Sequence, residues 1–149
     1  MVAPYKYYRV QDNSSATYFD VGEGFIAGDP ELPVRMFPRN DSEERNLSNA
    51  LDRHLDWYDT TPSPFISVYT DLDTARVSAN ARVKQGKRGV FIAHIDVKRI
   101  GGLYYRNVRG LADEIELEIQ PQALNNSRQE FIFLHHIPEK AVTGCEDFK

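Results

Sequence analysis

The sequence predicts a single domain of the α+β class. Three observations support this fold class. The length of 149 residues is typical of one domain. Short runs rich in aromatic and β-branched residues are separated by two longer segments of helical periodicity. No internal repeat, low-complexity tract or linker divides the sequence, so residues 1–149 are interpreted as one domain.

The first elements are a strand, a loop and an amphipathic helix. The run YKYYRV, residues 5–10, is aromatic and predicts the first strand. Residues 11–40 contain many prolines and glycines, and we expect a loop with at most one short element. Either Asp41 or Ser42 is suited to cap a helix over residues 41–59. One face of this helix is apolar at helical spacing, with Leu47, Leu51, Leu55 and Tyr58.

The middle of the chain alternates strand, helix and strand. FISVYT, residues 65–70, predicts a strand that leads directly into a helix over residues 71–86. A glycine closes that helix. RGVFIAHIDV, residues 88–97, predicts a buried strand. The apolar face of the helix comprises Leu72, Ala75, Ala79 and Val83.

The last third is less regular. Residues 104–108, YYRNV, are compatible with an edge strand or a turn. The alternation in RGLADEIELE, residues 109–118, favours a short helix but leaves a strand open. Residues 121–129 are expected to form a polar loop. EFIFLHHI, residues 130–137, predicts a further strand, which residues 138–144 close.

Composition and charge limit the classes of function. The net charge is −4, with 22 acidic and 18 basic residues, which argues against nucleic acid or an anionic membrane as a partner. This net charge is compatible with a local basic pocket. The single cysteine, Cys145, excludes an intramolecular disulfide. No apolar run approaches the ~18 residues of a membrane span, and the start lacks the apolar core of a signal peptide. A soluble protein is therefore expected, with its compartment open.

Common catalytic and metal motifs are absent. The sequence has no phosphate-binding P-loop, dinucleotide GxGxxG, CxxC, HExxH or GxSxG. The pair His135–His136 falls within a predicted strand, where adjacent side chains point to opposite faces. We therefore expect one histidine inside and one outside, and no metal site.

Ser67 is the first candidate functional residue. It interrupts the apolar strand of residues 65–70, and a strand that is simply buried does not need a central serine. The strand period of two places Phe65 and Tyr69 on the same face as Ser67, with Ile66 and Val68 on the other.

Two charged residues accompany Ser67 in other predicted strands. Arg9 ends the first strand and Glu130 begins a late one. Each alone has an ordinary structural explanation, but together and in this order they resemble the arginine–serine–glutamate class of mono-ADP-ribosyltransferases. This is the group of cholera toxin and the pierisin-like enzymes, and the chain also resembles uncharacterised fungal domains of this shape. The matching stretches are YYRV (7–10), VGEGFIAGD (21–29), RNLSNALDRHLDW (45–57), SPFISVYTDLDTA (63–75) and QEFIFLHHIPEKAVTG (129–144).

The resemblance implies split mixed or antiparallel β-sheets with flanking helices, NAD as co-substrate, and no metal. Glu130 would stabilise the oxocarbenium-like transition state as the nicotinamide–ribose bond breaks. Arg9 would clamp the pyrophosphate. Ser67 would orient Glu130 and the nicotinamide. Tyr69 and Gly24 would complete the NAD-binding site.

The sequence departs from the family pattern at two places. The usual Ser-Thr-Ser is here Ser67-Val68-Tyr69. Tyr69 could stack on nicotinamide or block its pocket, and both alternatives stay open. Two residues before the catalytic glutamate, the family has Glu or Gln where this chain has Arg128. Arg128 and the adjacent Gln129 are predicted to face the acceptor, and a cation there disfavours arginine as the target.

The function expected is therefore an NAD-dependent mono-ADP-ribosyltransferase of toxin or effector type with a protein acceptor, or an NAD glycohydrolase. The alternative is an inactive binding module or effector that keeps the fold. RNA 2′-phosphate transfer is disfavoured by the net charge of −4. We predict packing roles for His54, Trp57 and the Tyr104–Tyr105 pair, and an inert Cys145.

Overall fold

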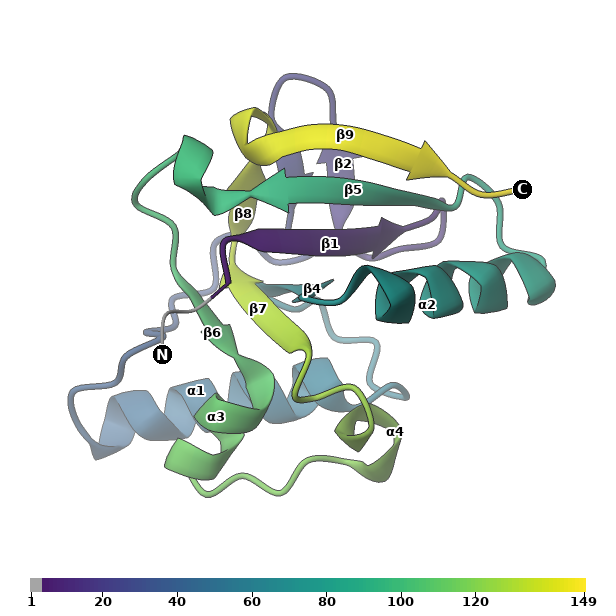
Figure 1. Cartoon of the computed structure of the whole chain (residues 1–149). Coiled ribbons are helices and arrows are strands. Elements are labelled where there is room, and N and C mark those ends of the chain that lie inside the picture. The colour runs from purple at the N-terminus through teal and green to yellow at the C-terminus, as the bar shows by residue number, and fades with distance from the viewer. Residues whose placement is uncertain (1–3) are drawn as a thin grey trace.

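Two antiparallel β-sheets form the centre of the computed structural model, which describes residues 4–149 (Figure 1). The larger sheet has the strand order β6-β7-β4-β1-β5-β9, and the smaller has the order β2-β3-β8. The strands are β1 (Lys6–Gln11), β2 (Tyr18–Asp20), β3 (Gly24–Ile26), β4 (Phe65–Tyr69), β5 (Phe91–Asp96), β6 (Tyr105–Asn107), β7 (Glu130–Leu134), β8 (His136–Pro138) and β9 (Val142–Asp147).

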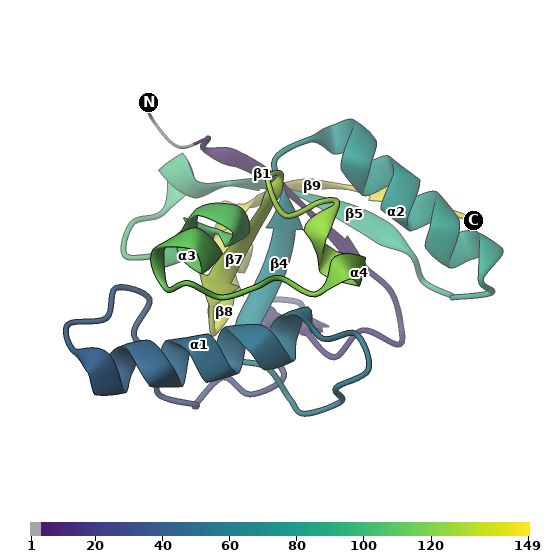
Figure 2. The ribbon, with the colours of Figure 1, turned by 90° about the horizontal axis from the view of Figure 1, so that it is seen from below.

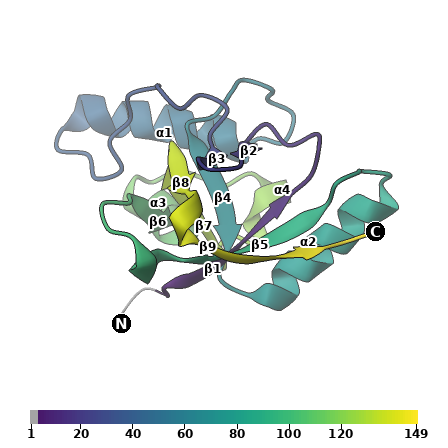
Figure 3. The ribbon, with the colours of Figure 1, turned by 90° about the horizontal axis from the view of Figure 1, so that it is seen from above.

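Helices cover the larger sheet in two groups. Viewed from below, α1, α3 and α4 lie under β4 and β7, whereas α2 lies beside β1 and β5 (Figure 2). Seen from above, β9 runs along the outer edge and carries the C-terminus toward α2 (Figure 3). The helices are α1 (Asp41–Leu55), α2 (Leu72–Lys84), α3 (Val108–Glu114) and α4 (Pro121–Leu124), with 3₁₀ turns at Val97–Arg99 and Glu139–Ala141.

The alternation of β4 divides its side chains between two cores, as predicted. Ile66 and Val68 are fully buried in the core between the two sheets. Phe65 points the other way and packs against α1 and α3. Ser67 and Tyr69 lie on the same side as Phe65, but beyond the end of that apolar core. Val68, which stands where the family pattern has the threonine of Ser-Thr-Ser, is therefore a core residue.

The larger sheet splits at one point, and this split creates the site. Strands β1 and β4 are paired only at Tyr8 and Tyr69. Beyond that pair they diverge, and the Arg9 Nη1 donates to the Ser67 carbonyl oxygen at 3.0 Å. A side chain thus supplies the hydrogen bond that a neighbouring strand would otherwise provide.

Most predicted elements are confirmed, with shifts at their ends. The cap of α1 is Asn40, whose side chain accepts from the Glu43 N–H, so neither Asp41 nor Ser42 is the cap. The helix ends at Leu55, which leaves Tyr58 outside it and 82% exposed. YYRNV contains an edge strand, and the ambiguous segment 109–118 begins in helix α3.

Three expectations were wrong, two of them because the elements are too short to show a period. The loop predicted at residues 11–40 contains the β2–β3 pair, and residues 121–124 form the single turn α4. The strand predicted at 130–137 is broken at His135, which has φ +67. Both histidines are consequently half-buried, and each ring contacts a backbone carbonyl, that of Leu32 or Glu23.

Within residues 4–149, none of the helices has the length and apolar character needed to cross a bilayer.

Candidate active site

Arg9, Ser67 and Glu130 meet where β1 and β4 diverge. The Ser67 hydroxyl donates to Glu130 Oε2 at 2.6 Å, and Arg9 binds the Ser67 carbonyl. The sequence separations are 58 and 63 residues, so only the sheet order β7-β4-β1 brings the three together. The polar trio selected from the sequence is therefore one cluster.

Glu130 is a buried carboxyl whose proton affinity is increased. Its side chain lies at the start of β7 and the residue is 8% exposed. Burial raises the pKa of Glu130 to about 7, although the Ser67 hydrogen bond and the Arg9 charge act in the opposite direction. Near neutral pH, Glu130 can therefore take up or release a proton, as an acid–base catalyst must.

His54 belongs to this cluster, and its predicted role as a packing residue was incomplete. The ring does pack edge-on against Phe65, with centroids 5.6 Å apart. Its Nε2 also lies 2.6 Å from Ser67 Oγ, and its Nδ1 lies 2.6 Å from Ser63 Oγ. The sequence held a signal for this: His54 follows Leu47 by seven residues and Leu51 by three, which places a polar ring on the core face of α1.

The ring of His54 is neutral. One edge of it faces the cavity, yet burial, and then the charge of Arg9, lower the pKa of His54 to about 4. A neutral imidazole has one donor and one acceptor nitrogen. Because Ser67 donates to the carboxylate, its oxygen accepts from His54 Nε2–H, and Nδ1 accepts from the Ser63 hydroxyl.

The hydrogen bonds thus form a directed chain that ends at the carboxylate. The Phe65 N–H donates to Ser63 Oγ at 3.0 Å and supplies the first link. Ser63, His54 and Ser67 then each donate to the next group. Such a chain stabilises the ionised form of Glu130 and fixes the orientation of its Oε2.

Arg9 is a buried cation without an anionic partner. It is 9% exposed, and its Nε and Nη2 donate to Gln11 Oε1 at 3.1 and 2.8 Å. Burial, and then the nearby Arg82, lower the pKa of Arg9 to about 10, so it remains charged at neutral pH. No carboxylate of residues 4–149 lies within ion-pair distance of it. A buried, unneutralised guanidinium is suited to receive an anion.

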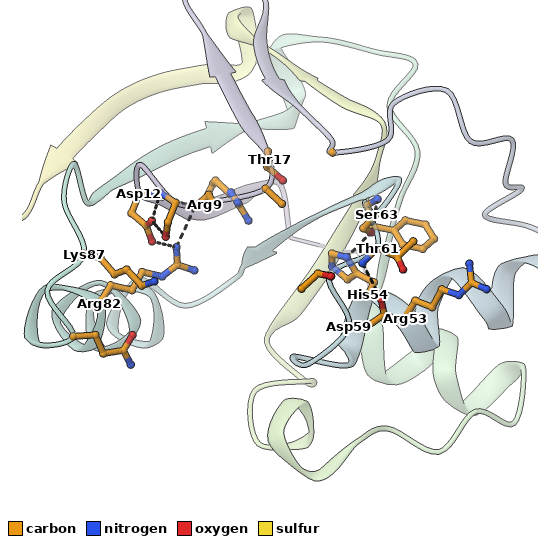
Figure 4. Close-up of a pocket in the computed structure, with 17 residues that line it drawn as sticks. Arg9, Asp12, Thr17, Arg53, His54, Asp59, Thr61, Ser63, Arg82 and Lys87 are labelled. Carbon is orange, nitrogen blue, oxygen red and sulfur yellow. Dashed lines mark hydrogen bonds and ion pairs between the residues drawn. The ribbon is translucent and has the colours of Figure 1, made fainter.

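Two adjoining cavities open onto this cluster. The larger, here called the Glu130 chamber, has a volume of about 770 Å³ and contains Ser67, Tyr69 and Glu130 in its wall. The smaller, here called the cationic chamber, has a volume of about 450 Å³, and the residues that line it are drawn in Figure 4. Both lie within the usual size range of small-molecule sites. The residues common to the two chambers are Arg9, His54, Arg82 and Gln85.

The comparisons with known proteins agree with this fold. A family model described as "Domain of unknown function (DUF7587)" matches residues 2–149. The chain belongs to this family. A search of curated proteins finds no match. Among solved structures, EcPltA, a pertussis-like toxin A chain and an ADP-ribosyltransferase, aligns with a TM-score of 0.51 and 13% identity, over 97% of this chain and 83% of that one. At this identity the likeness shows the fold, which is ADP-ribosyltransferase-like and α+β.

Tyr69 leaves the Glu130 chamber of this DUF7587 domain open. Its side chain lies in the wall, opposite Glu130 in the β4–β7 register. Burial raises the pKa of the Tyr69 hydroxyl, which is therefore neutral. The volume of about 770 Å³ is that of the chamber with Tyr69 in place, so the phenol narrows the chamber without filling it.

Gly24 lies apart from both chambers. It pairs with Pro138 in the smaller sheet and has φ +101. A Cβ at this position would collide with the Ile137 carbonyl oxygen. Glycine here allows β3 and β8 to approach closely, which is a structural requirement.

The two predicted acceptor residues lie beside the Glu130 chamber and do not line it. Arg128 is exposed, and Gln129 is half-buried with its carbonyl accepting from the Thr70 N–H. Their loop reaches the chamber through three other residues, Gln122, Ala123 and Asn126.

Trp57 lines the Glu130 chamber, and the packing role predicted for it from the sequence was wrong. It was expected to pack, but it is 69% exposed and lines the Glu130 chamber just after α1. Tyr104 is likewise 61% exposed, whereas its neighbour Tyr105 stacks on Phe133 as expected. Cys145 is exposed as a residue, but partial burial of its thiol, and then the charge of Asp147, raise its pKa and keep it in the less reactive protonated form.

In residues 4–149 no group of three or more histidine, cysteine, aspartate or glutamate side chains is placed to hold a metal ion.

Proposed function

We propose that this DUF7587 domain cleaves the nicotinamide–ribose bond of NAD+ and transfers ADP-ribose to an acceptor, which we take to be a protein, or to water. The observation that supports this most is the Ser67–Glu130 hydrogen bond beside the unneutralised Arg9, at the base of an open chamber. The fold shared with EcPltA provides the context.

The pyrophosphate of NAD+ would bind at Arg9. Three of its N–H groups are already engaged by Gln11 and Ser67, which fixes the plane of the guanidinium and leaves its other donors for oxygen atoms of the substrate. Arg82 provides a second cation close by, held by Asp12 at 2.8 Å. With the pyrophosphate here, the nicotinamide riboside would extend into the Glu130 chamber.

The chemical step requires a stabilised cation and a base. The bond between ribose C1′ and the pyridinium nitrogen breaks, and its electron pair leaves with neutral nicotinamide. The positive charge on C1′ is stabilised by the Glu130 carboxylate in a cavity of low dielectric. The acceptor oxygen or nitrogen then bonds to C1′ and loses a proton, which Glu130 can accept because its pKa is about 7.

His54 and Ser67 would act as positioning residues. They do not reach the broken bond in this scheme. Their directed hydrogen bonds hold Oε2 of Glu130, which leaves the second carboxylate oxygen free for the ribose.

The loop before β7 would select the acceptor. It carries Arg128 and Gln129, and it reaches the Glu130 chamber through Gln122 and Asn126. The cation at Arg128 disfavours an arginine target and favours an acidic or neutral side chain.

The test is release of nicotinamide from NAD+ by the purified protein, compared with Glu130→Gln and with Glu118→Gln, which changes an exposed glutamate of the same charge. We expect release by the wild type and Glu118→Gln, and a loss of at least ~100-fold in Glu130→Gln. Equal release from all three proteins would refute the role of Glu130.

A second candidate is a non-catalytic module that binds the nucleotide. It is favoured by Tyr69, which replaces the last serine of the family motif and narrows the chamber. Calorimetric binding of NAD+ without any release, even with cell protein added as acceptor, would support this candidate. Tyr69→Ser should then restore turnover if the phenol is the obstacle.

A further inference from the structure

The cationic chamber has more positive charge than a pyrophosphate needs. Four cationic side chains line it, Arg9, Arg53, Arg82 and Lys87, against two carboxylates, those of Asp12 and Asp59. This excess occurs in a chain whose net charge is −4. Because positive charge is concentrated in this chamber although the chain as a whole is negative, the chamber is suited to an anionic ligand.

Both carboxylates of the chamber are occupied by protein groups. Asp12 is almost fully buried and binds Arg82 Nη1, together with the backbone N–H and hydroxyl of Ser14. Asp59 accepts from the Thr61 N–H. Asp12 is therefore committed to Arg82. Asp59 keeps its charge, but hydrogen bonds from Thr61, and then the charge of Arg53, lower its pKa, and it lies on the Arg53 side of the chamber rather than beside Lys87 (Figure 4). Within the described residues, Lys87 and Arg53 form no ion pair.

Lys87 and Arg53, which have no ion-pair partner among the described residues, lie on opposite walls of the cationic chamber. Lys87 follows the glycine that ends α2 and extends beside Arg82, whereas Arg53 belongs to α1 on the other side (Figure 4). Ser15 adds a hydroxyl on the Lys87 wall, and since its oxygen accepts from the Asp12 N–H, its own proton can be donated to a ligand. Cations mixed with hydroxyl donors are the groups that recognise a phosphate monoester.

The other chamber has a different character. Apart from Arg9 and Arg82, which both chambers share, Glu130 is the only charged residue in the Glu130 chamber wall, and the remainder is apolar or neutral. That wall suits the nicotinamide riboside, which needs no further cation. The adenosine half of a dinucleotide whose pyrophosphate lies at Arg9 would occupy the cationic chamber instead. Unsubstituted adenosine carries no negative charge that Lys87 and Arg53 could bind.

We propose that the domain accepts a nicotinamide dinucleotide that carries an additional phosphate on its adenosine ribose, as NADP+ does. This inference rests on the proposed function for the orientation of the dinucleotide. Arg9 and Arg82 bind the pyrophosphate, and Lys87 binds the additional phosphate, while Arg53 on the opposite wall adds to the positive potential of the chamber. The reaction at C1′ is the same as for NAD+, so no further reactant is required.

The experiment measures kcat/KM for nicotinamide release from NADP+ and from NAD+ in parallel. We expect NADP+ to be cleaved at least as efficiently as NAD+. Lys87→Gln should lower the NADP+/NAD+ ratio about tenfold, as loss of a charge-assisted hydrogen bond does, and Arg53→Gln should lower it less. Lys84→Gln, which removes a lysine of α2 outside both chambers, should leave the ratio unchanged.

A binding measurement separates this inference from the proposed function. Adenosine 2′,5′-bisphosphate and adenosine 5′-monophosphate are titrated by calorimetry into the wild type and Lys87→Gln. Tighter binding of the bisphosphate, lost in the variant, supports the additional phosphate site even if neither dinucleotide is cleaved. Equal binding of the two nucleotides, or a preference that Lys87→Gln does not reduce, overturns it.

Discussion

Ser67 and Glu130 are bonded diagonally across two neighbouring strands. In the antiparallel register of β4 and β7, Ser67 lies opposite Ile132, and Glu130 lies opposite Tyr69. The 2.6 Å hydrogen bond therefore joins a residue to a diagonal neighbour, two positions from its direct partner. The carboxylate leans along β4 toward His54 and Arg9, which is why four polar groups share one small volume.

The stability of the domain should depend on pH through two opposing groups. The pKa of Glu130 rises from its ordinary value of 4.5 to about 7 in the fold, so its contribution is present below pH 4.5 and is lost as pH rises through about 7. The pKa of His54 falls from 6.5 to about 4, so its contribution is present above pH 6.5 and is lost as pH falls through about 4. Between pH 4.5 and 6.5 the two slopes, each about 1.4 kcal/mol per pH unit, cancel.

A substitution of Glu130 or His54 should remove the contribution of that group and leave the pH dependence of the other. The unfolding free energy of Glu130→Gln, relative to wild type, should rise with pH across this window, and that of His54→Gln should fall. Urea denaturation at several pH values measures both, with Glu118→Gln as the control that stays parallel to wild type. Curves parallel to wild type for all three variants would show that neither group has a shifted pKa.

Replacement of Arg9 by lysine should impair NAD+ binding although the charge is kept. A lysine ammonium cannot bind Gln11 and Ser67 while also presenting a planar pair of donors to a pyrophosphate. We expect the dissociation constant for NAD+ to rise about tenfold or more. Arg45→Lys, on the exposed face of α1, is the matched control. Unchanged affinity in Arg9→Lys would mean that the pyrophosphate binds elsewhere.

His54 should affect turnover more than binding. His54→Phe keeps a ring against Phe65 but removes the donor to Ser67, so the Glu130 carboxylate loses its fixed orientation. We expect kcat to fall about tenfold with the NAD+ dissociation constant nearly unchanged. His54→Gln, whose amide can still donate, should recover part of the loss. A rise in KM with full kcat would instead indicate that His54 contacts the substrate.

The sequence predicted the parts of the fold in which a period extends over several turns or residues. The spacing of Leu47, Leu51 and Leu55 was sufficient to place α1, and the alternation around Ser67 correctly divided β4 between two faces. The three-residue strands β2 and β3 and the one-turn α4 are stabilised by tertiary pairing, so their sequences show no period. Strand β9 was missed because it is mostly exposed at a sheet edge and has no apolar alternation.

The site was only partly predictable for a related reason. Arg9, Ser67 and Glu130 stand out because charged and polar residues are unusual in apolar strands. His54 did not stand out, since a histidine on the apolar face of a helix is equally compatible with packing, and here it does both. The two chambers depend on the divergence of β1 from β4, which no local pattern encodes.

The two glycines of the β2–β3 region should differ in how well they tolerate alanine. Gly22 and Gly24 both have positive φ, at +96 and +101, so alanine at either position costs about 1–2 kcal/mol in backbone strain. The Cβ of Gly22→Ala meets no atom within 4 Å, whereas that of Gly24→Ala collides with the backbone of β8. Gly24→Ala should therefore lose at least about 2 kcal/mol more unfolding free energy than Gly22→Ala, measured by urea denaturation. Equal losses would mean that β3 and β8 can separate without cost, and that the close approach at Gly24 does not stabilise the smaller sheet.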